Sequence, residues 1–381
     1  MAGIIEPVGL GEPRAVDVSN LEAELSALWR TAAEGPAAEN AVMRACTLTL
    51  LIYVENDEAA YEVTNLVAEV TRQNPCRAII MMLEPDAARS GLEAWVSAHC
   101  HLPAAGEKQV CSEQITIRAR GEAGQGLPSV VLPLTVSGLP IFLWWRANGF
   151  SPPAYFDDIL RVTQHVIVDS ARYSLGARHL QDLAQWLHKF AGKIQLTDLN
   201  WNRITPWRQL IAQCFDAPER RPYLDRLRQV RIEYEDDSAR LVTQRSQGLL
   251  LTGWLASRLG WQFLKSERPR ESQPRIFYFR SPHGTVTVER SLKKVENACG
   301  VCFTIELISD GKPGARFSFK RGPDGKVVKT LAEVPGSAPI GRSVRVEVLD
   351  EAEILNEELK LGVRDRLYEE ALNVMSKTIG G

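Results

Sequence analysis

Residues 46–83 read CTLTLLIYVENDEAAYEVTNLVAEVTRQNPCRAIIMML and carry the clearest structural pattern in this chain. Residues 46–54 form an almost unbroken apolar run, which is typical of a strand buried on both faces. A second apolar run, Ala78 to Leu83, predicts another such strand. Between them, helical spacing predicts an amphipathic helix that ends before Pro75 and has on one face Ala59, Val63, Leu66, Val67 and Val70. This order of strand, helix and strand indicates a parallel, helix-covered sheet.

The same alternation continues beyond this segment. The sequence predicts a further helix, two strands, a helix and a strand, in that order, at Leu92 to Val96, Val110 to Ile117, Ile141 to Trp145, 156–162 and His165 to Val168. We therefore predict an α/β domain at 41–172 with a mostly parallel sheet. Residues 1–40 precede it and predict an N-terminal arm that carries one short helix.

The period of the apolar residues changes in the second half of the chain. Residues 176–259 predict helices, with one strand at Val230 to Tyr234. After Gly260 apolar and polar residues alternate, and glycine-containing turns separate the runs, as in antiparallel strands. A final helix is predicted from Glu351 to about Met375. Residues 173–381 are therefore predicted to form a helical segment followed by an α+β domain with an antiparallel sheet.

Composition excludes several classes of function. The 381-residue chain is 45% hydrophobic and has a formal net charge of −2, as a globular protein with a large core would. Nucleic acids and anionic membranes attract basic surfaces, so neither is predicted as a partner. No apolar run approaches the roughly 20 residues that span a bilayer, and the N-terminus lacks a secretory pattern. A cytoplasmic protein is predicted, and its seven widely spaced cysteines predict reduced thiols.

A search for motifs of catalysis gives little. Dinucleotide sites place Gly-x-Gly-x-x-Gly after the first strand, but here that strand is followed by Glu55, Asp57 and Glu58, which would repel a phosphate. Walker, nucleophile-elbow and His-Glu-x-x-His motifs do not occur. The run His99-Cys100-His101, with Cys111 nearby, suggests zinc, but the paired spacing of zinc ligands is missing. No catalytic residue, cofactor or metal site is therefore predicted.

Cys299 and Cys302 form a C-x-x-C pair with two interpretations. Such a pair can act as a redox couple, because the arrangement lowers thiol pKa values. However, the motif precedes a predicted strand, where residues three apart point to opposite faces unless Gly300 permits a bulge. Small packing residues are the alternative, and both interpretations stay open.

Two segments combine tryptophan with arginine: residues 137–146 and 198–208. Protein interfaces use such groups as anchors, since the ring supplies buried area and the guanidinium supplies directional donors. Core packing of arginine over a ring is the alternative. Neighbouring residues on a strand face opposite sides, so one of Trp144 and Trp145 is expected in the core. The candidates for a partner interface are Trp145, Arg146, Trp201, Arg203, Trp207 and Arg208.

Six segments in sequence order resemble the OpcA family of glucose-6-phosphate dehydrogenase assembly proteins. The resemblance runs from about Arg44 to Phe215 and rests on residues 44–50, 74–79, 110–115, 139–145, 168–170 and 198–208. It implies a non-enzymatic protein of cyanobacteria or actinobacteria, in the oxidative pentose phosphate pathway. Its partner would be glucose-6-phosphate dehydrogenase, whose active oligomer it would favour as an allosteric activator. The Arg-x-x-x-His-Tyr-Leu-Gly-Lys stretch typical of the dehydrogenase itself is absent.

In cyanobacterial relatives the resemblance also implies redox control through cysteines in the C-terminal part, with thioredoxin as a candidate second partner. The candidates in this chain are Cys299 and Cys302, although no motif after Gly260 carries the assignment. Arg203→Ala or Arg208→Ala is expected to weaken activation with little change in melting temperature. The alternative function is an α/β-class oxidoreductase that binds a nucleotide or a sugar phosphate, an analogy that rests on fold class alone.

Overall fold

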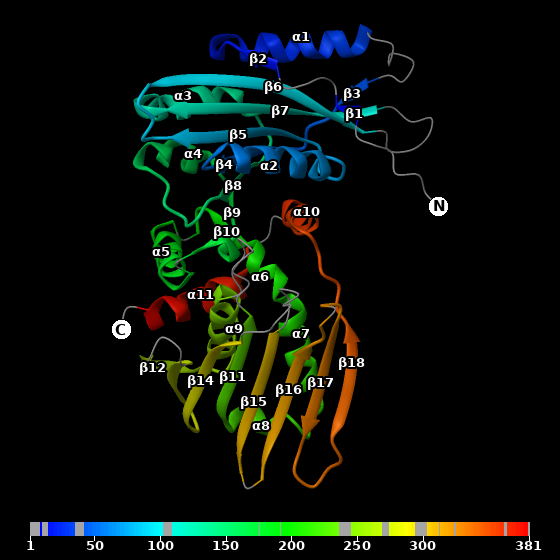
Figure 1. Ribbon diagram of the computed structural model, residues 1–381, viewed down its shortest axis with the longest axis vertical. Helices are drawn as coiled ribbons and strands as arrows, with labels where there is room; N and C mark the ends of the chain where they lie inside the picture. Colours follow the sequence, from blue (N-terminus) through cyan, green and yellow to red (C-terminus); the bar gives the residue numbers. More distant parts are fainter. Residues whose placement is uncertain are drawn as a thin grey trace.

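The chain builds two β-sheets along one long axis, sheet A toward the N-terminus and sheet B toward the C-terminus (Figure 1). Sheet A is mostly parallel and sheet B mostly antiparallel, which confirms the predicted pair of sheets. The computed structural model describes residues 8–9, 14–34, 42–101, 109–174, 176–190, 192–235, 245–268, 274–293, 303–311, 313–323, 325–361 and 364–379.

Sheet A follows the order β1-β6-β7-β5-β4-β8-β9-β10, with β2 also paired to β6 and β3 to β7. All pairings from β7 to β10 are parallel, and their side chains are buried on both faces, as continuous apolar runs require. The strands are β1 Val8–Gly9, β2 Arg14–Val16, β3 Val42–Arg44, β4 Leu48–Val54, β5 Cys76–Glu84, β6 Gly91–His101, β7 Gln109–Arg120, β8 Ile141–Arg146, β9 His165–Val168 and β10 Gln195–Asp198.

The helix predicted at Leu92 to Val96 is wrong, because these residues belong to strand β6. β6 runs antiparallel to β7, from the pair Gly91 and Arg120 to the pair His101 and Val110. The ladder of cross-strand hydrogen bonds outweighs the local helix preference of Leu, Glu and Ala. Strand β10 was not predicted either, and it carries sheet A past residue 172, where the sequence placed the domain end.

Cys100 and Cys111 lie opposite each other in the same β6–β7 ladder and form a disulfide with a Cα–Cα distance of 4.0 Å. The expectation of reduced thiols is therefore wrong for this pair. Register is the reason, since a tight pairing of two strands joins residues that the sequence keeps 11 positions apart. The thiolates that a zinc site would need are consumed by this bond. Cys46, Cys76 and Cys214 are free.

Helices cover both faces of sheet A. On one face α2 packs with α10, which returns from the C-terminal end of the chain, so Leu355 contacts the same core as Val63. On the other face lie α1, α3, α4 and α5, and the arm helix α1 buries Leu21 and Leu25 there. The bounds are α1 Leu21–Glu34, α2 Asp57–Val70, α3 Leu127–Val131, α4 Asp157–Val162, α5 Gly176–Lys189 and α10 Glu351–Leu361.

Sheet B follows the order β12-β13-β14-β11-β15-β16-β17-β18, and only the β11–β14 pairing is parallel among the described residues. Its alternating pattern follows from burial on one face, where Phe277, Phe279, Phe317 and Phe319 lie. The strands are β11 Leu227–Glu235, β12 Gln262–Glu267, β13 Arg275–Ser281, β14 Gly284–Lys293, β15 Phe303–Gly311, β16 Gly314–Arg321, β17 Val327–Glu333 and β18 Ile340–Arg345.

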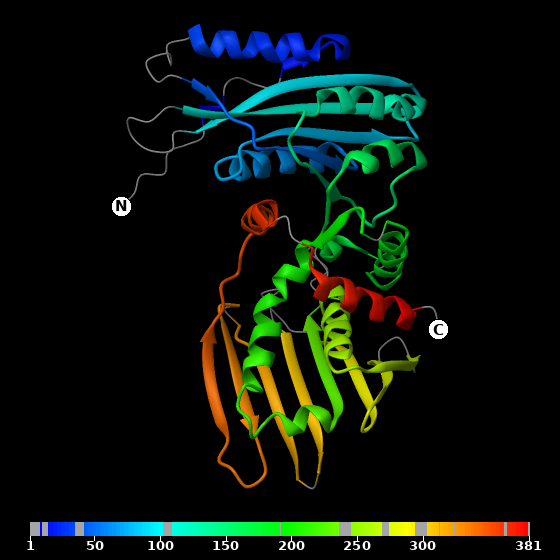
Figure 2. The ribbon, with the colours of Figure 1, turned by 180° about the vertical axis from the view of Figure 1, so that it is seen from behind.

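Helices on the buried face of sheet B join it to the rest of the chain (Figure 2). α9 and α11 cross so closely that a Cβ at Gly253 would lie 2.4 Å from the Ala371 carbonyl oxygen, so glycine is required there. The single final helix predicted from Glu351 is instead two helices: α10 packs with α2 on one face of sheet A, and α11 packs against α9 and α5. The bounds are α6 Leu199–Arg203, α7 Thr205–Cys214, α8 Pro222–Asp225, α9 Arg245–Arg258 and α11 Arg366–Ile379.

Candidate functional site

Four of the six predicted interface residues, Arg146, Trp201, Arg203 and Arg208, lie at a junction between the two domains. We use junction for the carboxyl ends of β8, β9 and β10 together with α6, Arg208 of α7, the start of α10 and Asp365 before α11. Parallel strands bring their carboxyl ends to one edge, so Arg146, Asp169 and Asp198 meet there although the sequence separates them. Figure 1 shows α6 and α10 beside this edge of sheet A.

Arg146, the last residue of β8, ties sheet A to both helices on its face. Its Nη2 donates to Glu62 of α2 at 2.6 Å, and its Nε donates to Glu351 of α10 at 3.1 Å. Only 4% of Arg146 is exposed. Burial opposes its charge, but the two carboxylates outweigh this and raise its pKa above the ordinary value. Arg146 therefore holds the C-terminal helix α10 onto the α/β domain.

Arg203, at the end of α6, makes a two-pronged ion pair with Asp169, which follows β9. The distances from Nη1 and Nη2 to the two carboxylate oxygens are 2.6 and 3.0 Å. Burial opposes ionisation of Asp169, but the Arg203 guanidinium outweighs it, so the pKa of Asp169 lies below its ordinary value. Arg172 continues the network, since its Nη2 lies 3.3 Å from Glu351.

Asp198, the last residue of β10, begins α6. Its side chain accepts the backbone N–H groups of Ser170 and Asn200, both at 2.9 Å, which is the chemistry of a helix cap. The Tyr368 hydroxyl of α11 donates to its other oxygen at 3.3 Å. Burial, together with the negative charge of Asp169, raises the pKa of Asp198 to about 6. The pKa values of the neighbouring carboxyl groups Asp169 and Asp198 therefore shift in opposite directions.

Trp201 and Arg208 form the second half of the junction. The indole N–H of Trp201 donates to Asp365 at 2.7 Å, and the Arg208 guanidinium carbon lies 3.7 Å from the centre of the Trp201 rings. Arg208 also donates to Thr205 Oγ1 at 2.7 Å. Burial lowers the pKa of Arg208 to about 10. In the described part of the chain no carboxylate forms an ion pair with Arg208.

The remaining candidates lie inside the protein. Trp145 is 2% exposed and stacks on Tyr53, with ring centres 3.9 Å apart, while Trp144 is buried in the opposite core. The two rings do face opposite sides, and both are core residues. Trp207 is also 2% exposed and lies toward sheet B, where Arg321 is 6.0 Å from its ring centre. In this conformation these tryptophans have almost no surface to offer a partner.

The geometry changes one expectation. Arg203→Ala would leave the buried Asp169 carboxylate without its main counter-charge, so an unchanged melting temperature is no longer expected. The sequence reasoning also missed the acidic partners, Glu351 and Asp365, because they lie more than 150 positions from the residues they bind. The only signal was a pair of acidic residues at the start of the last predicted helix. Cys299 and Cys302 lie outside the described residues.

A second feature of sheet A lies where open α/β sheets bind ligands, outside the carboxyl ends of β4 and β8. A hollow of about 290 Å³ is present there, lined by Tyr53, Glu55, Trp145, Ala147, Asn148, Gly149, Phe150, Ser151, Arg178, His179 and Asp182. Glu55 accepts the Asn148 backbone N–H at 3.0 Å, and the Asn56 side chain caps α2. The lining combines acidic Glu55 and Asp182 with basic Arg178 and His179, and Glu55 stands directly after β4, where its negative charge does not suit a pyrophosphate.

The described residues contain no cluster of three or more potential metal ligands. In the same part of the chain, every helix is too short or too polar to cross a bilayer.

Comparison with protein families gives two matches in consecutive order. Residues 67–185 match the glucose-6-phosphate dehydrogenase subunit N-terminal domain, and residues 194–372 match the corresponding C-terminal domain. Both matches include parts of the junction. An OxPP cycle protein named OpcA from Synechocystis is 28% identical over 82% of this chain, and one from Nostoc punctiforme is 34% identical over 51%. This chain spans 66% and 40% of the lengths of these relatives.

Solved structures with similar folds include a dehydrogenase (MviM) from Clostridium difficile, at 8% identity and a TM-score of 0.46, covering 87% of this chain and 97% of that one. Another is the WlbA dehydrogenase from Thermus thermophilus, at 13% identity and a TM-score of 0.42, covering 86% and 94%. Both TM-scores are below 0.5, so these likenesses carry no argument about activity.

Proposed function

Because this chain belongs to the OpcA family of glucose-6-phosphate dehydrogenase assembly proteins, we propose that it is a non-catalytic assembly factor for that dehydrogenase. It would bind the enzyme and favour its active oligomer. The observation that carries the proposal is the pair of family matches, which follow one another along residues 67–185 and 194–372. A scattered or partial match to a common α/β fold would not support a partner in this way.

Activation of this kind is a difference in affinity. A binding partner shifts an equilibrium only if it binds the active form more tightly than the inactive form. A tenfold preference corresponds to about 1.4 kcal/mol, which one or two well-placed side chains can supply. No bond needs to be made or broken in the assembly factor itself.

The junction supports this proposal because it would give a partner a rigid surface, which we call the platform. Ion pairs from Arg146 and Arg203 join sheet A, α6 and α10, so a surface built across them keeps one shape before a partner arrives. Of the six interface candidates, Arg203 and Arg208 are only half-buried. We propose that Arg208 is the contact residue, because its guanidinium pairs with no carboxylate in the described part of the chain. An acidic group of the dehydrogenase would form an ion pair with this guanidinium. The four other buried candidates would hold this platform in place.

Co-elution of the purified chain with the dehydrogenase on size exclusion, combined with dehydrogenase activity at low substrate, tests the proposal. We expect a complex and a rise in activity. Arg208→Ala should weaken activation, whereas Arg161→Ala, an exposed arginine of α4 whose side chain is 71% accessible, should not. The proposal fails if the two proteins never associate under oxidising or reducing conditions, or if the isolated chain turns over a metabolite.

Redox dependence is a further part of the proposal. Cys299 and Cys302 would join under oxidation and separate when a dithiol reductant such as thioredoxin acts on them. Titration of activation against a dithiol reductant, with Cys302→Ser as the variant, tests this. If both thiols stay open to alkylation after oxidant treatment, this pair is not the switch.

A second candidate function is an oxidoreductase, favoured by the hollow at the carboxyl ends of β4 and β8. It is the weaker candidate, because acidic side chains line the position where a phosphate would lie. Calorimetry with NADP and glucose 6-phosphate on the isolated chain separates the two. Heat of binding would favour an enzyme or a sensor, and its absence would favour the assembly factor.

A further inference from the structure

A second cavity lies at the edge of sheet B, beside the C-terminal end of the helix that carries Arg208. It occupies about 330 Å³ between the C-terminal part of α7 and the edge strands β17 and β18. Its size is at the lower end of the range for small-molecule sites. The lining residues are Leu210, Gln213, Cys214, Asp216, Ala217, Arg220, Thr330, Ala332, Ile340, Arg342 and Val344. We call it the edge hollow.

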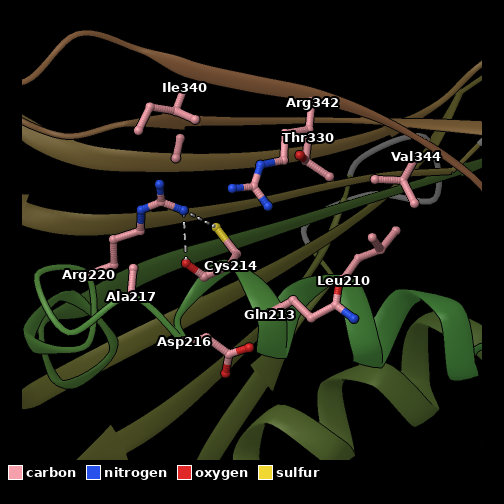
Figure 3. A pocket seen from close by; sticks show the side chains of 11 residues that line it. Leu210, Gln213, Cys214, Asp216, Ala217, Arg220, Thr330, Ile340, Arg342 and Val344 are labelled. Atoms are coloured by element: carbon pink, nitrogen blue, oxygen red, sulfur yellow. Dashed lines mark hydrogen bonds between the residues drawn. The ribbon is translucent and has the colours of Figure 1, made fainter.

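Two guanidinium groups converge in the edge hollow. Figure 3 shows the side chains of Arg220, from the turn after α7, and Arg342, from β18, on either side of the Cys214 sulfur. Arg220 Nη1 donates to the Cys214 carbonyl oxygen at 3.2 Å, which fixes its position. Arg342 lies on the same face of β18 as Val344 and reaches into the hollow from the sheet.

No counter-ion within the described residues neutralises these two charges. Neither Arg220 nor Arg342 forms an ion pair with a carboxylate in that part of the chain. Asp216 also lines the hollow, but Figure 3 shows its carboxylate turned away from both guanidinium groups. Two like charges in one cavity repel each other, and an anion between them removes that cost.

The other residues of the lining indicate the chemical nature of the anion. Thr330 supplies a hydroxyl and Gln213 an amide, both of which can donate to oxygen. The remaining wall is apolar, with Leu210, Ile340 and Val344. Two planar guanidinium groups match the spread oxygens of a phosphate better than a single charge does. The apolar wall suits a small organic body attached to it.

We propose that the edge hollow binds a small phosphate monoester with a compact apolar body, held between Arg220 and Arg342. The site uses none of the residues proposed above for the dehydrogenase contact, although α7 carries both Arg208 and part of the lining. It would give the chain a way to respond to a phosphorylated metabolite.

Calorimetry on the full chain at low salt tests the proposal with phenyl phosphate, inorganic phosphate and phenol as probes. We expect saturable binding of phenyl phosphate, weaker binding of inorganic phosphate because it lacks the apolar body, and none of phenol. Arg342→Gln should weaken phenyl phosphate binding at least about tenfold, which corresponds to about 1.4 kcal/mol. Benzoate, a carboxylate with the same ring, should bind less tightly than phenyl phosphate.

Arg345→Gln is the matched control, because Arg345 lies on the same strand but faces away from the hollow and is exposed. We expect its affinity for phenyl phosphate to stay within about twofold of the wild-type value. A second readout is alkylation of Cys214, followed by mass spectrometry, since a ligand between the two arginines would cover its sulfur. The proposal is overturned if the wild-type chain shows no saturable binding of phenyl phosphate, or if Arg342→Gln and Arg345→Gln weaken this binding equally. It is also overturned if phenyl phosphate leaves the alkylation rate of Cys214 unchanged.

Discussion

At the junction, Arg146, Arg172 and Arg203 each lie within ion-pair distance of a carboxylate, whereas Arg220 and Arg342 in the edge hollow face none among the described residues. The two regions contain the same chemical group in opposite settings. A paired, buried arginine is part of the structural frame of the protein, and its removal leaves a buried carboxylate without a counter-ion. An unpaired arginine beside a cavity keeps its donors for a ligand. The contrast separates structural from binding arginines without reference to their sequence neighbours.

The largest test of this contrast is Arg203→Gln. The change leaves Asp169, which is 1% exposed, without its two-pronged partner. Among the described residues, Arg172 Nε at 3.9 Å is the remaining cationic group, and the Ala171 backbone N–H at 3.1 Å is a neutral donor. We expect the free energy of unfolding to fall by about 3–5 kcal/mol, the usual cost of breaking a buried ion pair. Urea denaturation followed by circular dichroism measures it.

Arg161→Gln is the control for this variant. Arg161 pairs with Asp158 one helical turn away, but the two side chains are 71% and 60% accessible. Its loss should change the free energy of unfolding by less than about 0.5 kcal/mol. Equal losses in the two variants would mean that the junction pair is no more than a surface contact.

A smaller effect is expected from Trp201→Phe. A smaller aromatic ring replaces the indole, the hydrogen bond to Asp365 at 2.7 Å is lost, and this carboxylate is left without that donor. Hydrogen bonds to charged groups contribute about 1.5–3 kcal/mol, so we expect a loss near 2 kcal/mol in denaturant titrations. Trp186→Phe is the matched change, because the buried Trp186 Nε1 has no hydrogen-bond partner among the described residues. If both variants lose the same amount, the bond to Asp365 does not stabilise the junction.

The pH dependence of stability gives a third test. The pKa of Asp198 is about 6 in the folded protein, above the ordinary value of 3.8, so the folded state binds the proton more tightly. Its contribution to stability is therefore complete below pH 3.8 and is lost as the pH rises through 6. Asp169, whose pKa is lowered, acts in the opposite sense, so only a comparison of variants isolates Asp198.

Asp198→Asn keeps a side-chain oxygen for the helix cap and removes the titration. Between pH 4.5 and pH 7 its stability should improve relative to wild type by about 2 kcal/mol. Urea titrations at both pH values measure this difference. A constant difference across the range would show that Asp198 does not titrate there.

Sequence patterns predicted the layered parts of the fold best where burial is uniform. The run 46–54 predicted a buried strand, and β4 occupies Leu48–Val54 with parallel neighbours on both sides. The failure at β6 has a physical cause, since residues 92–94 favour a helix locally, and residues 91–101 become a strand through long pairing with β7. Short β10 was missed because four residues carry too little periodicity.

The sites were harder to predict than the fold, because their partners come from distant positions. Arg146 and Trp201 were singled out from local sequence, but one carboxylate partner of Arg146, Glu351, and the partner of Trp201, Asp365, lie on or next to helices near the end of the chain. The edge hollow gave no sequence signal, since Arg220 and Arg342 are more than 100 positions apart and unremarkable in their surroundings. Contacts of this kind depend on register and helix placement, which local patterns do not encode.

The smallest expected effect completes the comparison. Arg342→Gln removes one of two like charges and breaks no ion pair within the described residues, so the free energy of unfolding should stay the same or rise by up to about 0.5 kcal/mol. This change in the free energy of unfolding has the opposite sign to the change expected for Arg203→Gln. Phenyl phosphate at ten times its dissociation constant should then stabilise wild type by about 1.4 kcal/mol and the variant far less. A marked loss of stability in Arg342→Gln would assign this arginine to the frame and remove the distinction between the two regions.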